Sequence, residues 1–176
     1  MPRFRDKALP FISEKEISEI CIRLGLQISN DYTGKELIAL VILKGSIVFA
    51  ADLVRQISLP LKIDFVRLSS YGHGTESSGT VRIIKDISMN ITGKNVLIIE
   101  DILDTGHTLT LFTNHLKASK PESVKICTLL DKPSRRKTFI KADYCGKTIE
   151  DRFVVGYGLD VDEKCRNYRD ILYLKS

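Results

Sequence analysis

The chain has 176 residues, of which 43% are hydrophobic and 28% charged, so its composition is that of one globular domain and excludes a disordered chain. The 27 basic and 22 acidic residues give a net charge of +5, which favours anionic ligands and keeps nucleic acid open as a partner. The four cysteines do not have the spacing of metal ligands or of a disulfide framework, and we find no apolar stretch as long as a signal peptide or a membrane span. We therefore expect a cytoplasmic protein without a membrane partner.

The first predicted element is a helix that begins after Ser13. Ser13 and Glu16 have the spacing of a capping box, and Ile12 and Ile17 can pack across it as a hydrophobic staple. Apolar residues then recur at helical spacing as far as Ile28, so we expect one buried helix face.

Apolar runs separated by turns then predict strands that alternate with helices. Strands are expected over 37–43, 61–68, 96–99, 123–130, 153–155 and 171–174, and helices over 47–57 and 109–116. This alternation implies βαβ crossovers, a mostly parallel sheet and an α/β domain. The segment 69–79 is rich in Gly and Ser and cannot pack a core, so it is predicted to be a mobile lid.

The segment that follows the predicted strand 96–99 carries the strongest functional signal. Glu100 and Asp101 close the strand, and the turn 104–108 leads into a helix. Ligands of open α/β sheets bind beyond the carboxyl ends of the strands, where helix N-termini offer free N–H groups to anions. Neighbouring strand residues point to opposite faces, so we expect the chain to leave the sheet at these carboxylates, where both can reach one ligand. The pattern predicts a ribose 5-phosphate site.

Simpler explanations exist for several of these residues. Asp104 could be an ordinary helix N-cap, and His107 could be exposed without any catalytic role. The basic run 132–137 could be a solvated turn, and a Phe within the predicted strand 153–155 could be a core aromatic.

The segment from Val96 to Leu109 resembles the phosphoribosyl pyrophosphate signature of the type I phosphoribosyltransferases. Further segments, at 43–46, 69–75, 129–136 and 153–160, look like their counterparts in the hypoxanthine-guanine phosphoribosyltransferases, in the same order and spacing. The resemblance implies a type I phosphoribosyltransferase fold in a single domain spanning 1–176. A mainly parallel central sheet flanked by helices would form a core over about 37–160, with a small hood from the terminal segments and a mobile lid over about 69–82.

The resemblance implies an enzyme of purine salvage, which transfers 5-phosphoribose from phosphoribosyl pyrophosphate to hypoxanthine, with guanine as a further substrate. Glu100 and Asp101 would hold the ribose hydroxyls. Asp104 would face N7 of the purine as general acid/base. The 5-phosphate would bind the turn formed by Asp104, Thr105, Gly106, His107 and Thr108.

By the same resemblance, Lys132 would donate to the 6-oxygen of the purine and Phe153 would stack on its ring. Val154 would contribute backbone groups to the edge of the base. A different phosphoribosyltransferase, specific for adenine or a pyrimidine, is disfavoured by Lys132 together with Phe153.

The remaining implied contacts concern pyrophosphate. Lys44 and Gly45 would offer backbone N–H groups to it, after a cis peptide bond between Leu43 and Lys44, and Arg166 would reach it with its side chain.

The resemblance also implies Mg²⁺ as cofactor, held by Asp160 with Glu100 and Asp101. Ser70 and Tyr71 would belong to the lid, which excludes water while the bond to ribose breaks.

Val161 and Cys165 stand where the family usually has aromatic residues, so the relative use of hypoxanthine, guanine and xanthine and the placement of Arg166 stay open. Family members imply a homodimer or homotetramer. The rival hypothesis is an RNA-binding regulator that kept the ribose-phosphate site. The positive net charge is its sole support, and a regulator would need neither Asp104 nor Lys132, so nucleic acid is not the expected partner.

Overall fold

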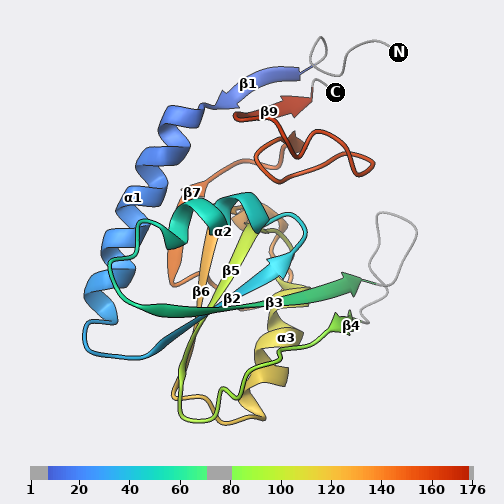
Figure 1. Cartoon of the computed structure of the whole chain (residues 1–176). Helices are drawn as coiled ribbons and strands as arrows, with labels where there is room; N and C mark the ends of the chain where they lie inside the picture. The colour runs from blue at the N-terminus through green and yellow to red at the C-terminus, as the bar shows by residue number, and fades with distance from the viewer. Residues whose placement is uncertain (1–7, 71–80, 175–176) are drawn as a thin grey trace.

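The computed structural model describes residues 8–70 and 81–174, and its central feature is a six-stranded sheet in the order β4-β3-β2-β5-β6-β7 (Figure 1). Its strands are β2 (Leu37–Leu43), β3 (Leu61–Ser70), β4 (Val81–Lys85), β5 (Asn95–Leu103), β6 (Ser123–Asp131) and β7 (Tyr144–Thr148). All neighbours pair in parallel except β3 and β4, which are antiparallel. The mainly parallel sheet is confirmed, whereas β4 and β7 were not predicted.

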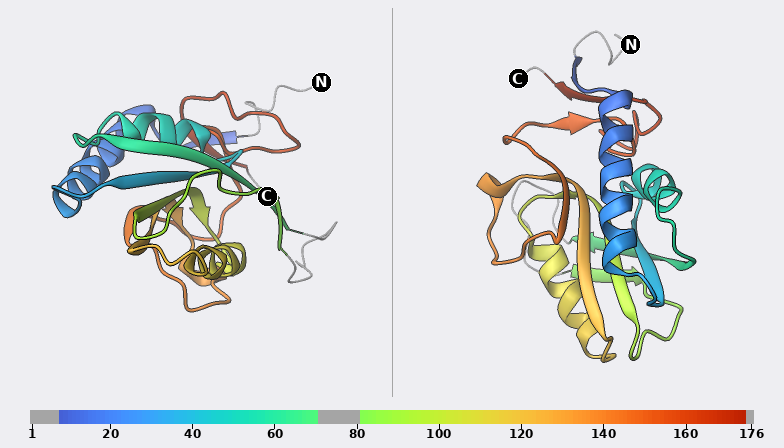
Figure 2. Two further views of the ribbon diagram at one scale, coloured as in Figure 1. Left: turned by 60° about the horizontal axis from the view of Figure 1, so that its bottom comes forward. Right: turned by 90° about the vertical axis from the view of Figure 1, so that its left-hand side faces the viewer.

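Helices cover both faces of this sheet. α1 (Glu14–Asp31) and α2 (Ile47–Val54) pack on one face and α3 (His107–Lys117) on the other (Figure 2). Within the described residues, no helix combines the length and apolar character needed to cross a membrane.

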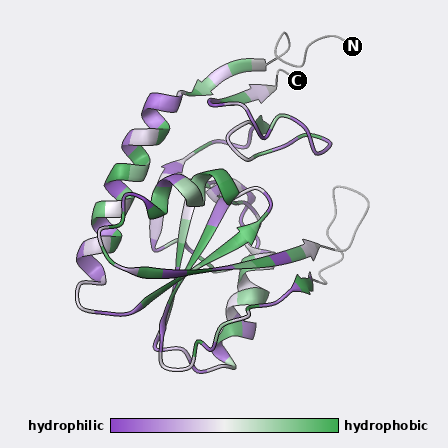
Figure 3. Cartoon of the chain, viewed as in Figure 1, coloured by the Kyte–Doolittle hydropathy of each residue, from purple (hydrophilic) through white to green (hydrophobic). Residues whose placement is uncertain are grey.

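Burial on both faces explains the uninterrupted apolar sequence of β2. Leu37, Ala39 and Val41 belong to the core beneath α1 and α2, and Ile38 and Leu40 to the core beneath α3. A parallel strand with helices on both sides has no polar face, and β2 accordingly has the hydrophobic colour in Figure 3.

The start of α1 follows the sequence prediction. The Ser13 hydroxyl accepts a hydrogen bond from the backbone N–H of Glu16 at 3.2 Å, and Ile12 and Ile17 are each 1% exposed within the same core. α2 begins at Ile47 as expected but ends at Val54, three residues short of the predicted end.

A second, smaller sheet of order β1-β9-β8 lies above the carboxyl ends of the central strands (Figure 1). It consists of β1 (Ala8–Ile12), β8 (Val154–Val155) and β9 (Ile171–Leu174), and its pairings are antiparallel. β1 was not predicted. We refer to this sheet and the loop 156–170 as the hood.

The segment predicted as a lid, about 69–82, begins and ends within strands. Residues 69 and 70 are the end of β3, residues 81 and 82 begin β4, and the register pairs Ser70 with Val81. Tyr71 and the rest of the lid, 71–80, lie outside the described residues.

Candidate active site

The site begins at the carboxyl end of β5, which is longer than its neighbour β2. β5 pairs with β2 as far as Ile99 but continues beside β6 as far as Leu103. Glu100 and Asp101 therefore lie within a strand, and the expectation that the chain leaves the sheet there was wrong. They are accessible because one edge of β5 loses its partner after Ile99.

The loop that follows β2 closes against this free edge. Gly45 lies so near Asp101 that a Cβ atom at residue 45 would stand 1.7 Å from the Asp101 Oδ2 atom. The other oxygen of Asp101 accepts a hydrogen bond from the N–H of Ile102 at 2.7 Å. The predicted cis peptide bond between Leu43 and Lys44 is present.

Glu100 and Asp101 form a carboxylate pair. The Glu100 side chain accepts a hydrogen bond from the N–H of Asp101 at 3.2 Å. Burial, and the neighbouring charge of Asp101, raise the pKa of Glu100 well above its usual range. None of the ion pairs among the described residues involves either carboxylate, so the pair suits a ligand that brings hydroxyl donors or a cation.

A cavity of about 270 Å³ unites most of the predicted sugar-phosphate residues. Its lining comes from β2, β3, β5, the turn after β5 and the start of α3: Ile42, Leu68, Glu100, Asp101, Ile102, Leu103, Asp104, Thr105, Gly106, Thr108 and Leu109. His107 is not part of the lining, although its N–H approaches the Thr105 hydroxyl at 3.4 Å. Ile42 and Leu68 were not predicted as site residues.

The turn before α3 excludes the simpler of the two explanations for Asp104. The N-cap of α3 is Gly106, with φ of 80°, so Asp104 is not the cap. A side chain at residue 106 would collide with Ile140 and Thr138, each within 2.5 Å of its Cβ, and the left-handed backbone also favours glycine. Gly106, Thr108 and Leu109 line the cavity, so the N-terminal end of α3 borders it, and a helix N-terminus is a favourable place for a phosphate.

The predicted purine residues lie between the turn after β6 and the hood. Lys132 is only 7% exposed, and its ammonium donates to the Arg152 carbonyl at 2.6 Å. Val154 is buried in β8, while Phe153 remains 57% exposed. The basic run is therefore not a uniformly solvated turn, since Arg136 also points inward, to Asp131 and to the Leu103 carbonyl at 3.3 Å.

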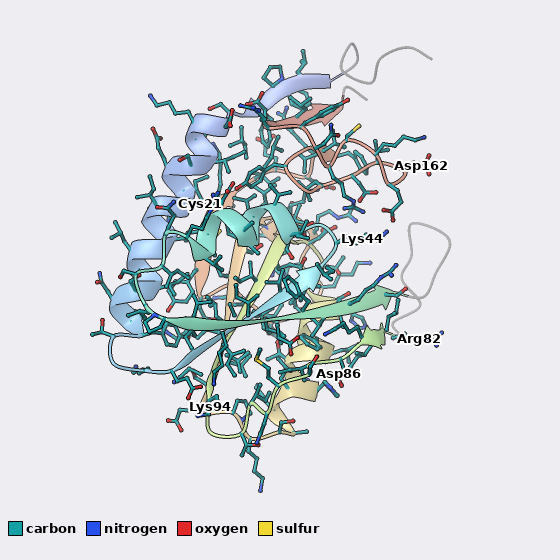
Figure 4. The ribbon with its side chains drawn as sticks, in the orientation of Figure 1. Cys21, Lys44, Arg82, Asp86, Lys94 and Asp162 are labelled. Atoms are coloured by element: carbon teal, nitrogen blue, oxygen red, sulfur yellow. The ribbon has the colours of Figure 1, made fainter. Side chains whose placement is uncertain are left out.

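The predicted pyrophosphate residues meet at a carboxylate that was not predicted as a site residue. Glu163, in the hood loop, lies 2.8 Å from the Lys44 ammonium and 3.2 Å from the Arg166 guanidinium. Arg166 also pairs with Asp160 at 2.9 Å. Figure 4 shows Lys44 and the hood loop, marked by Asp162, on the same side of the molecule.

Asp160 is not grouped with the carboxylate pair of β5. The described residues contain no cluster of three or more side chains able to hold a metal. Mg²⁺ usually keeps several water molecules and binds one or two carboxylates together with substrate phosphates, so a site on Glu100 and Asp101 needs no such cluster. Arg166 borders a separate cavity of about 470 Å³ between α1, α2 and the hood loop.

Three further charged residues of the site were missed: Arg135, Asp151 and Glu163. Arg135 pairs with Asp104 at 2.9 Å and with Asp151 at 3.3 Å. No spacing signal could have revealed these contacts, because the partners of Arg135 lie 31 and 16 residues away and the Lys44 partner of Glu163 lies 119 residues away.

A parallel sheet that carries paired carboxylates before a phosphate-binding helix N-terminus, with a hood over the strand ends, is the architecture of a phosphoribosyl-transferring domain. The chain belongs to the phosphoribosyl transferase domain family, whose model matches residues 13–162.

Curated relatives and solved structures agree with this assignment. The chain is 53% identical over 164 residues to the hypoxanthine-guanine phosphoribosyltransferase of Staphylococcus aureus, covering 93% of this chain and 92% of that protein. A crystal structure of a hypoxanthine phosphoribosyltransferase from Staphylococcus aureus superposes with a TM-score of 0.94 at 50% identity, covering 97% of this chain and 94% of that one. A hypoxanthine-guanine phosphoribosyltransferase from Bacillus anthracis gives 0.91 at 48% identity, covering 95% and 98%.

Proposed function

We propose that this chain is a purine salvage enzyme, a pentosyltransferase that moves 5-phosphoribose from phosphoribosyl pyrophosphate to N9 of hypoxanthine or guanine, giving IMP or GMP and diphosphate. The observation that carries the proposal is the cavity at the end of β5. It combines the Glu100–Asp101 pair with the N-terminus of α3, so one space offers acceptors for ribose hydroxyls and donors for the 5-phosphate.

The reaction forms a bond between N9 of the purine and C1 of the ribose and breaks the bond from C1 to the diphosphate oxygen. Asp104 lines the same cavity and would take the proton from N7 as N9 attacks, so that the electron pair of the N7–H bond stays in the ring. Thr105 and Thr108, with the backbone of Gly106, would fix the phosphate and hence the ribose.

The leaving diphosphate would meet the N–H groups of the loop at Lys44 and Gly45 and the side chain of Arg166. When bound, Mg²⁺ would neutralise part of the diphosphate charge, and Glu100 and Asp101 are the residues proposed to hold it. Asp160, expected from the sequence as a third ligand, pairs with Arg166 and is not grouped with them. Ser70 and Tyr71 are proposed to close over the ribose and exclude water.

Lys132 is proposed to select purines that carry a 6-oxygen. Its ammonium is buried and already donates to a carbonyl, that of Arg152, so it is fixed and ready to donate a second hydrogen bond to another oxygen. Adenine presents an amino group at this position and would leave the ammonium facing a donor. Phe153 would stack on the ring, and Val154 would bind its edge through backbone groups.

The test measures nucleotide formation from hypoxanthine, guanine, xanthine and adenine, each with phosphoribosyl pyrophosphate. The wild-type chain is expected to use hypoxanthine and guanine and to reject adenine. Lys132→Ala is expected to lower kcat/KM for hypoxanthine by about 10- to 100-fold, the loss of one hydrogen bond to a charged group, with the KM for phosphoribosyl pyrophosphate unchanged. A wild-type chain without transferase activity would refute the proposed function. An unchanged base preference in Lys132→Ala would show that Lys132 does not contact the base.

We further propose a homodimer or homotetramer that works in the cytoplasm. Several large apolar side chains are exposed on α2, β3 and β4, namely Ile47, Ile63, Phe65 and Ile84. All four cysteines are free thiols, which suits a reducing compartment. Light scattering coupled to size-exclusion chromatography would measure the oligomeric state, and a monomer at micromolar concentration would contradict the proposal.

A further inference from the structure

We propose that Arg135 is a positioning residue of the purine site, which holds Asp104 and, through Asp151, Lys132 in one arrangement. The inference rests on the proposed function, because it takes Asp104 and Lys132 as the side chains that meet the purine.

Four charged side chains of alternating sign form a continuous series. Arg135 Nε lies 2.9 Å from Asp104 Oδ1, and Arg135 Nη1 lies 3.3 Å from Asp151 Oδ2. The second oxygen of Asp151 lies 3.6 Å from the Lys132 ammonium. The series joins the turn after β5, the 3₁₀ turn Pro133–Arg135 after β6, and the segment that leads into β8.

The two ends of the series match two atoms of one purine edge. N7 and the 6-oxygen lie side by side on the same edge of a 6-oxo purine. Asp104 is assigned to N7 and Lys132 to the oxygen, so a base can meet both only if their separation is fixed. Arg135 and Asp151 are the groups that connect them.

The chemistry of a guanidinium suits this task. Its planar, forked donors can hold two carboxylates at once, whereas an ammonium is a compact point charge on a flexible stem. Asp104 is not a helix cap, so no capping bond restrains its side chain. The ion pair that the structure gives this side chain is the one with Arg135. The guanidinium also separates two carboxylates, Asp104 and Asp151, that would otherwise repel each other.

Stability does not account for the series. The side chains of Arg135, Asp104 and Asp151 are 43%, 37% and 50% exposed, and exposed ion pairs of this kind contribute little to folding. The next residue, Arg136, differs from Arg135 because its contacts are buried. Its side chain is only 14% exposed and contacts Asp131 and two backbone carbonyls. Replacing Arg135 should therefore leave a folded protein in which catalysis can be measured.

The experiment compares Arg135→Gln, Arg135→Lys and a matched control, Arg169→Gln. Arg169 is also an exposed arginine, 80% exposed, and pairs with a carboxylate, Glu14, at the start of α1. For Arg135→Gln, kcat with hypoxanthine is expected to fall by about 10- to 100-fold, the cost of a misplaced catalytic group, with the KM for phosphoribosyl pyrophosphate unchanged. Arg135→Lys should recover part of the loss, and Arg169→Gln should behave as wild type.

A double-mutant cycle separates positioning from a general structural effect. If Arg135 acts mainly through Asp104, the variant that carries both Arg135→Gln and Asp104→Asn should lose clearly less activity than the two single losses combined. Equal kcat for wild type and Arg135→Gln, or additive losses in the double variant, would overturn the inference while leaving the proposed function intact. A wild-type chain that forms no nucleotide would instead refute the function itself.

Discussion

Replacing Gly45 with alanine tests the ribose site by moving a single carboxylate. The new Cβ would stand 1.7 Å from Oδ2 and 2.7 Å from Cγ of Asp101, whereas ordinary van der Waals contact begins at 3.4 Å. The Asp101 side chain is short, so it must rotate away, and its hydrogen bond from the N–H of Ile102 would be lost. Asp101 would then no longer point at the space proposed for the ribose hydroxyls.

The size of the effect follows from the interaction that is lost. A hydrogen bond to a charged group contributes about 1.5–3 kcal/mol, so the affinity for phosphoribosyl pyrophosphate should fall by about 10- to 150-fold. Isothermal titration calorimetry with phosphoribosyl pyrophosphate measures this directly, and the KM for hypoxanthine at saturating phosphoribosyl pyrophosphate should change little.

Gly34→Ala is the matched control. Gly34 has φ of +75°, and no atom lies within 4 Å of the place that a Cβ would take, so alanine strains the backbone there without touching another group. It should cost about 1–2 kcal/mol of folding free energy and lower Tm by several degrees, with binding unchanged. Wild-type affinity in Gly45→Ala, or an equal loss of affinity in Gly34→Ala, would refute the reasoning.

Three further predictions concern single charges. Asp104→Asn should lower kcat by about 10²- to 10⁴-fold with little change in the affinity for phosphoribosyl pyrophosphate; an equal loss in both would mean a structural role. Glu163→Gln removes a carboxylate that pairs with Arg166, whose side chain is proposed to bind pyrophosphate, and with the ammonium of Lys44 beside it, so product inhibition by diphosphate should become stronger. Asp162→Asn, which loses the pair with Lys164, should not change it. Two lysines lower the pKa of Glu36 from 4.5 to about 2, so this group stabilises the fold above pH 4.5 and ceases to do so as pH falls toward 2. The difference in Tm between wild type and Glu36→Gln should therefore shrink over this range, and a constant difference would contradict the assignment.

Local signals explain which parts of the fold were predictable. The start of α1 depends on Ser13, Glu16 and two flanking isoleucines that are neighbours in the chain, and β2 is a continuous apolar run because both its faces are buried. β1 and β7 have no comparable pattern. Both are short strands at the edge of a sheet. β1 pairs with β9, which is distant in the sequence, and β7 pairs with β6.

The site was predictable where one contiguous segment builds it. The segment from Glu100 to Thr108 supplies both the carboxylate pair and the turn proposed to bind phosphate, and all but His107 of the residues predicted there line the cavity. The end of β5 differs from the prediction because sequence does not reveal that the pairing of β5 with β2 ends at Ile99 while its pairing with β6 continues. Arg135 and Glu163 were missed because their importance lies in contacts across the fold.

The order of strands in the hood has a practical consequence for any preparation of this enzyme. β9 lies between β1 and β8. The strand that carries Val154, β8, therefore pairs with the last described strand of the chain, which in turn pairs with the first. An exopeptidase that removed β9 would spare the cavity at β5 and α3, proposed for the sugar-phosphate, but would remove the strand that supports β8, proposed to bind the base. Such clipped molecules would sequester the sugar donor without consuming it, and a titration of donor-binding sites would then overcount the working enzyme.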